Sequence, residues 1–158
     1  MLGGYDKSRT EFPDASSKTL PLDADNSRIL SVPIQSISAT NTLDGAGMLT
    51  NTSFVAVIDS TVPHMWLPLE ACTKFEQAFG LTFDPDTGLY LVNDTIHTRL
   101  QQMNPSVLIS LGSSNDPSET IQISFPYDAF DLEASHPLYP SNMSKTYFPI
   151  RRASDSSD

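Results

Sequence analysis

The stretch FVAVIDSTVPHMWLP, residues 54–68, decides how the chain is interpreted. An apolar run leads into Asp59, two hydroxyl residues follow, and the chain's single tryptophan, Trp66, comes soon after. A nearly continuous apolar run bounded by turn residues is typical of a strand that is buried on both faces. The stretch therefore predicts a buried strand over residues 54–58 that ends at a carboxylate and then turns sharply.

Asp59 has two interpretations from the residues alone. An aspartate at the end of a strand often accepts hydrogen bonds from the backbone amides of the following turn. Alternatively, Asp59 is a general base held at the tip of a buried strand. Acid–base work on water by carboxylates normally needs two of them in one site, so Asp59 would be half of such a site. Both interpretations stay open at this point.

Composition limits the classes of function. A chain of 158 residues suits one domain, or one lobe of a larger protein, and 39% hydrophobic residues suffice for a core. The net charge of −10 argues against nucleic-acid and anionic-membrane partners. The single cysteine, Cys72, excludes an internal disulfide and a cysteine-based zinc site, and the three histidines lack ligand spacing. We therefore expect no metal and no cofactor.

The remaining pattern predicts a mainly β chain with two short helices. Residues 68–80 form the clearest helix, with Pro68 at its start, Gly80 past its end and Ala71, Cys72, Phe75, Ala78 and Phe79 on one face. A second helix is expected over residues 94–104, and a hairpin over 106–112 and 120–125. Residues 41–53 have the composition of a loop, and RRAS at 151–154 reads as part of a solvated terminus.

The order of these motifs resembles the second lobe of pepsin-like aspartic peptidases. AVIDSTVPHMWLP resembles their active-site strand, with Asp59 at the catalytic aspartate and residues 66–68 at the tail motif. LGGYD at residues 2–6 resembles the segment that closes their first lobe, and NPSVLISLG and ETIQISFPYDAFDL resemble later strands. The resemblance covers Leu2 to about Ala153 and is nearest to divergent filamentous-fungal members. It implies a pepsin-like acid-protease lobe that lacks the closing strands.

Two positions depart from the family pattern beside the aspartate. Thr61 stands where the family has a glycine, which adds bulk and restricts the backbone. Val62 replaces a family serine or threonine that bonds the aspartate, while Ser60 keeps a supporting hydroxyl. The expectation from these changes is that Asp59 keeps its strand but loses part of its support.

The resemblance implies a division of the chain and a set of possible roles. Residues 1–28 would be the end of a first-lobe strand and a linker, 29–153 the second-lobe domain, and 154–158 a disordered acidic tail. Asp59 would be one member of a water-activating pair acting on peptide bonds, inactive alone, completed by a first lobe or by a homodimer. The alternatives are a non-catalytic pseudo-peptidase binding module and a truncated fragment.

Three N-x-Ser/Thr sequons, at Asn51, Asn93 and Asn142, favour glycosylation and a secreted full-length form. The first residues of the chain lack the charged and apolar regions of a secretion signal. We therefore expect an extracellular or secretory-pathway location for a longer form, and no membrane segment in this chain.

Overall fold

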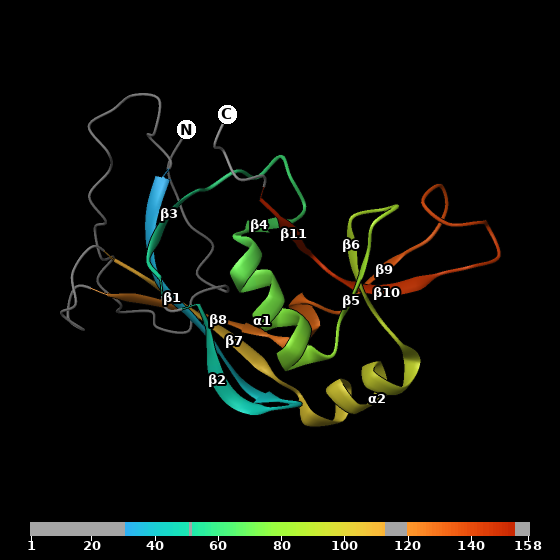
Figure 1. Ribbon diagram of the computed structural model, residues 1–158, viewed down its shortest axis with the longest axis horizontal. Helices are drawn as coiled ribbons and strands as arrows, with labels where there is room; N and C mark the ends of the chain where they lie inside the picture. The colour runs from blue at the N-terminus through green and yellow to red at the C-terminus, as the bar shows by residue number, and fades with distance from the viewer. Residues whose placement is uncertain (1–30, 51, 113–119, 154–158) are drawn as a thin grey trace, which may run out of the picture.

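The computed structural model describes residues 31–50, 52–112 and 120–153. Their strands form a five-stranded, a four-stranded and a two-stranded sheet (Figure 1). The five-stranded sheet has the order β2-β1-β7-β8, and β3 also pairs with β1. Its strands are β1 (Ser31–Thr42), β2 (Gly45–Thr50), β3 (Phe54–Val57), β7 (Ser106–Leu111) and β8 (Ile121–Pro126). The proposed segments 1–28 and 154–158 lie outside the described residues.

The long strand β1 organises the five-stranded sheet. Its first residues pair with β3 in the register Ser31↔Val57, and its later residues pair with β2. Its other edge pairs with β7, so Ile37 lies between Thr50 on one side and Ile109 on the other. Strands β2 and β3 therefore share one side of β1, with β2 and β3 following each other along that edge.

The hairpin predicted from the alternating pattern is confirmed. Strands β7 and β8 pair antiparallel, with Ser106 opposite Pro126 and Leu111 opposite Ile121. Along β7 the buried residues alternate with half-buried ones, as expected where one face of the sheet covers the core.

The four-stranded sheet has the order β5-β6-β10-β9, and β4 and β11 form a parallel pair. In Figure 1 the two larger sheets lie on opposite sides of the molecule, with helix α1 between them. The elements are β4 (Met65–Leu67), β5 (Thr82–Asp84), β6 (Leu89–Val92), the 3-10 helix η4 (Tyr127–Ala129), β9 (Leu132–Ala134), β10 (Lys145–Phe148) and β11 (Ile150–Arg152).

Both predicted helices are confirmed. Helix α1 spans Leu69–Phe79, and the five residues predicted to share a face are all buried. Gly80 ends it with a φ of 64°, and a side chain there would approach Leu43 Cδ1 to 2.9 Å, so glycine suits the position. Helix α2 spans Asp94–Met103, with Leu100 as its buried residue and Asn104 as its left-handed cap.

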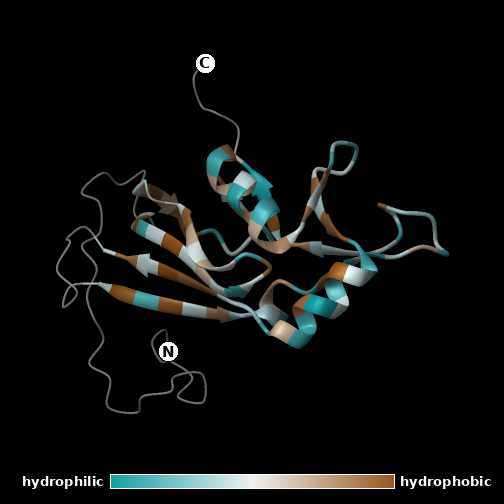
Figure 2. Cartoon of the chain, turned by 60° about the horizontal axis from the view of Figure 1, so that its bottom comes forward, coloured by the Kyte–Doolittle hydropathy of each residue, from teal (hydrophilic) through white to brown (hydrophobic). Residues whose placement is uncertain are grey.

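The core lies between α1 and the sheets. Its largest fully buried side chains include Tyr90, Phe75, Phe79, Phe130 and Phe148. Figure 2 shows apolar and polar segments alternating along the strands of the five-stranded sheet. Because successive side chains of a strand point to opposite faces, this alternation places the apolar residues on the face that covers the core.

The interpretation of residues 41–53 as a loop is wrong. Strand β2 occupies Gly45–Thr50, after a turn in which the Thr42 hydroxyl donates to the Gly45 carbonyl at 2.7 Å. Two glycines and an alanine gave this segment the composition of a loop. Pairing with β1 and burial of Leu49 nevertheless hold it in the sheet, because strand formation depends more on a partner than on intrinsic preference.

The expectation that residues 54–58 are buried on both faces is also wrong. In β3 the side chains alternate between half-buried and exposed, and Val55 and Val57 are exposed. One side of this strand packs on the core, and the described residues leave the other side uncovered. An apolar run thus marks a strand, but here it does not mark one covered on two faces.

Candidate functional site

Asp59 lies two residues beyond the end of β3, where the sequence placed it. Strand β3 is held along β1 by four paired residues, from Ser31↔Val57 to Ile34↔Phe54. Asp59, Ser60 and Thr61 then form an exposed turn. The strand therefore fixes the position of the carboxylate, and the turn leaves it open to approach from outside the domain.

Thr61 holds the Asp59 carboxylate with two hydrogen bonds. The Thr61 backbone N–H donates to Asp59 Oδ1 at 2.8 Å, and the Thr61 hydroxyl donates to the same oxygen at 2.6 Å. The hydroxyl bond, and after it the amide bond, hold the pKa of Asp59 below its ordinary value. Both bonds are made to the same oxygen, Oδ1. The other oxygen, Oδ2, accepts no hydrogen bond from a described residue.

This geometry changes the interpretation of Thr61 and Ser60. The sequence suggested that Thr61 weakens the support of the aspartate, yet its hydroxyl is the stronger of the two influences on the Asp59 carboxylate. Within the described part of the chain, Ser60 makes no side-chain hydrogen bond, so it does not support Asp59 here. Val62 is exposed, and its aliphatic side chain has no group that could form a hydrogen bond with Asp59.

Replacing Thr61 with valine is expected to raise the pKa of Asp59, because the valine keeps the backbone amide bond but loses the hydroxyl. The charged carboxylate is stabilised by that hydroxyl, so its contribution to stability exists above the ordinary pKa and disappears as the pH falls through the lowered one. Carbon-13 NMR titration of the Asp59 carboxyl measures the shift directly. Thr61→Ser is the matched control and should titrate like the parent; an unchanged titration in the valine variant would contradict this role.

An apolar groove of about 820 Å³ adjoins Asp59. It lies between the sheet, which contributes Ile34, Ile37 and Ile109, and the segment that leads into β4 and α1. Asp59 is the one carboxylate among its lining residues. The groove can thus receive apolar groups beside a single negative charge, and it brings no second carboxylate to Asp59.

His64 also lines this groove but does not complete an acid–base pair with Asp59. Burial, and after it the positive charge of Arg151, lower the pKa of His64 below its ordinary value. Its Nε2 atom is buried and has no hydrogen-bond partner among the described residues. The imidazole is therefore mainly neutral at neutral pH.

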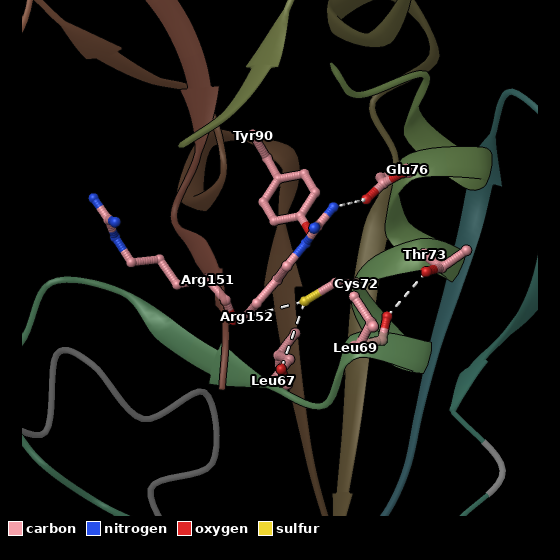
Figure 3. Close-up of polar contacts among 8 residues, drawn as sticks. All are labelled: Leu67, Leu69, Cys72, Thr73, Glu76, Tyr90, Arg151 and Arg152. Atoms are coloured by element: carbon pink, nitrogen blue, oxygen red, sulfur yellow. Dashed lines mark hydrogen bonds and ion pairs between the residues drawn. The ribbon is translucent and has the colours of Figure 1, made fainter. Parts of the chain in front are cut away.

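Pairing with β11, and a polar cluster of Arg152, Tyr90 and Glu76, hold the segment that carries Trp66 in place (Figure 3). Met65 N–H donates to the Pro149 carbonyl at 2.8 Å, and Ala153 N–H donates to the Leu67 carbonyl at 2.8 Å. Arg152, which comes from β11, points toward Tyr90 and Glu76 in the same view. This cluster connects the strand beside the groove with α1 and β6.

Arg152 makes most of the contacts in that cluster. Its Nε donates to the Tyr90 hydroxyl at 2.7 Å and its guanidinium reaches Glu76 Oε1 at 3.1 Å. It also lies 3.6 Å from the centre of the Phe83 ring. Burial raises the pKa of Tyr90 to about 12, so the phenol stays neutral. Cys72 lies beside the cluster, buried, and burial raises the pKa of its thiol, which suits a structural role.

The interpretation of residues 151–154 as a solvated terminus is wrong for the two arginines. Arg151 and Arg152 belong to β11, opposite Trp66 and Leu67 of β4. Sequence reasoning missed them because a short run of two arginines before polar residues has no periodicity that separates strand from tail.

Two of the three sequon asparagines lie in the described residues. Asn93 is the N-cap of α2, and its Oδ1 accepts a hydrogen bond from Ile96 N–H at 2.9 Å. Asn142 is exposed between β9 and β10. Asn51 lies outside the described residues. Glycosylation at these asparagines stays a prediction.

Across 31–50, 52–112 and 120–153, no three His, Cys, Asp or Glu side chains gather where they could hold a metal ion. Nor does any helix there have the length and apolar character needed to cross a bilayer.

Comparison with known proteins identifies the fold. No family model matches the chain, and no curated protein matches its sequence. A solved structure, the aspartic proteinase from Irpex lacteus, is similar with a TM-score of 0.53 and 16% sequence identity. The match covers 88% of this chain and 37% of that one, so the chain spans about a third of the proteinase. The predicted fold class, one mainly β pepsin-like lobe with two helices, is confirmed.

Proposed function

We propose that the chain is the second lobe of an aspartic-peptidase-like protein, nearest to divergent fungal members. In this role Asp59 is one of two carboxylates that activate a water molecule against a peptide carbonyl. The observation that supports it is the position of Asp59. It lies at the tip of a sheet strand with one oxygen held by Thr61 and the other without a described partner. A low pKa keeps such a group charged, as the base of a carboxylate pair must be.

The second carboxylate must come from elsewhere, because Asp59 is the one acidic residue lining the groove. A first lobe is the preferred source, and a second copy of this chain is the other. A homodimer would bring together two chains whose sequence charge is −10 each, which disfavours close approach. The isolated chain is therefore expected not to hydrolyse peptides.

A non-catalytic binding module is the second candidate, and one observation favours it. The groove beside Asp59 is largely apolar, and exposed Val55, Val57 and Trp66 border it. Such a surface can bind a partner whether or not Asp59 takes part in chemistry. A truncated fragment without its own activity is the outcome if neither hydrolysis nor binding is found.

We also propose that the native form passes through the secretory pathway and carries glycans at Asn93 or Asn142. Both asparagines are exposed in the folded domain, and neither amide nitrogen takes part in a described hydrogen bond. The side-chain oxygen of Asn93 caps α2, which leaves its nitrogen available for a sugar.

The intact mass of the native protein, before and after removal of N-glycans, is the first test. A deglycosylated mass well above 17.3 kDa would place this chain in a longer polypeptide, which the peptidase proposal requires unless two copies pair. Hydrolysis of a denatured protein substrate between pH 2 and pH 6, blocked by a pepstatin-type inhibitor, is then expected. Absence of hydrolysis in the native form would overturn the peptidase proposal in favour of the binding module.

A further inference from the structure

His64 anchors the loop that connects β3 to β4 (Figure 1). Residues 58–63 of this loop are all exposed, and His64 is the first residue after them that is half-buried. Its side chain lines the groove beside Asp59. The centre of its ring lies 6.0 Å from that of Tyr147 in β10. His64 therefore holds the far end of the loop that carries Asp59 against β10.

The imidazole of His64 occupies a place where a positive charge is unfavourable. Its Nε2 atom is buried and has no hydrogen-bond partner among residues 31–50, 52–112 and 120–153. In the protonated form both ring nitrogens are donors, so a buried N–H of a cation would have no acceptor. An unpaired buried charge costs far more free energy than an unpaired neutral group, so the packed imidazole favours its neutral form.

The charged groups of the surrounding elements do not offset this cost. From β11, the positive charge of Arg151 acts on the His64 ring. From β10, Tyr147 offers an aromatic ring, and Lys145 of the same strand is exposed and positive. Strand β4 carries no ionisable side chain. Asp59 is the one carboxylate that lines the groove, and its hydrogen bonds come from its own turn.

The packed position of His64 is therefore stable at neutral pH and less stable in acid. Burial, and after it the charge of Arg151, lower the pKa of His64 below its ordinary value of 6.5. A base with a lowered pKa contributes its full stability above the ordinary pKa and loses it as the pH falls from there to the lowered value. Because His64 is half-buried and residues 58–63 are exposed, the charged imidazole reaches water by turning outward.

We propose that His64 is an acid-sensitive anchor, which packs beside Tyr147 when neutral and turns out to solvent when protonated, so that acid opens the groove beside Asp59. The hydrogen bonds from Thr61 to Asp59 do not involve His64, so the carboxylate keeps its turn in both states. The open state lies in the acid range of the proposed hydrolysis. The anchor does not depend on that hydrolysis, since it would serve a non-catalytic binding module equally.

Proton NMR of the 158-residue chain at about pH 7.5 and about pH 5 tests the anchor above the range in which most carboxylates titrate. At the higher pH we expect a nuclear Overhauser effect between the ring protons of His64 and Tyr147. At the lower pH it should be lost. The rings of Phe79 and Phe148, whose centres lie 4.9 Å apart in the core, should keep theirs at both values, which shows that the fold persists.

Hydrogen exchange of the Met65 amide, which donates to the Pro149 carbonyl at 2.8 Å, measures the release of the loop. Between the same two pH values its protection, corrected for the intrinsic pH dependence of exchange, should fall at least about threefold. His64→Phe keeps an aromatic ring without the titrating nitrogens and should make the protection independent of pH. His64→Gln, neutral and polar, should do the same if phenylalanine does not fit. His136→Gln, at an exposed histidine, should behave like the parent.

Three results would overturn the proposal. One is a contact between the His64 and Tyr147 rings that persists at about pH 5. Another is an equal loss of Met65 protection in the parent and in both His64 variants, which would assign the acid sensitivity to another group. The third is loss of the core aromatic contact over the same pH range, which would mean that the whole domain unfolds. None of these measurements involves peptide hydrolysis, so failure here is distinct from failure of the peptidase proposal.

Discussion

Replacing Phe148 with alanine is expected to lower the free energy of unfolding by about 3–5 kcal/mol. Phe148 is fully buried at the end of β10, and its ring lies 4.9 Å from that of Phe79 and 5.5 Å from that of Phe130. It therefore joins the four-stranded sheet to α1 and to the segment after η4. A domain of this size is stable by about 5–15 kcal/mol, so the variant loses a large share of its stability. Urea unfolding followed by circular dichroism measures the loss.

Two further variants make the Phe148 result specific. Phe148→Leu keeps most of the apolar volume and should cost less than the alanine variant. Leu138→Ala removes an apolar side chain that is 52% exposed and should change stability by no more than about 0.5 kcal/mol. A loss below about 1 kcal/mol for Phe148→Ala would show that the aromatic cluster is not the centre of the core.

The helices were predictable because their signals are local. In α1 the buried face repeats at helical spacing, and Gly80 takes the left-handed backbone that ends the helix. Strand β2 was not predictable in the same way, since its glycines weaken the local preference and its stability comes from β1. Pairing with a neighbouring strand leaves no periodic signal within the paired segment itself.

The candidate site was predictable in part, for a similar reason. The run into Asp59 correctly located the carboxylate at a strand end, and the interpretation of a turn held by backbone hydrogen bonding is confirmed by the Thr61 amide. The role of the Thr61 hydroxyl was missed, because the turn signal of an aspartate concerns the backbone two residues on and not the side chain there. The exposed face of β3 could not be seen, because an apolar run looks the same whether one or both faces are covered.

Replacing Asp59 with asparagine in the native form of the protein is expected to lower kcat for peptide hydrolysis by at least about 10²–10⁴-fold, if Asp59 activates water. Asparagine has nearly the same shape but cannot accept a proton from water at acid pH. The Asp59 side chain is exposed, and among the described residues it makes hydrogen bonds with Thr61 alone, so the fold should be unaffected. The rate is measured with a fluorogenic peptide between pH 2 and pH 6, beside the unfolding curve of each variant.

Thr61→Ser is the control that separates chemistry from structure in this experiment. It keeps both donors to Asp59 Oδ1, so its rate and its pH profile should stay close to those of the parent. Thr61→Val should shift the acid limb of the profile to higher pH, because Asp59 then takes up its proton sooner. A native form that hydrolyses peptides equally well with asparagine at position 59 would assign the chemistry to another residue. Asp59 would then remain the acceptor that holds the turn after β3.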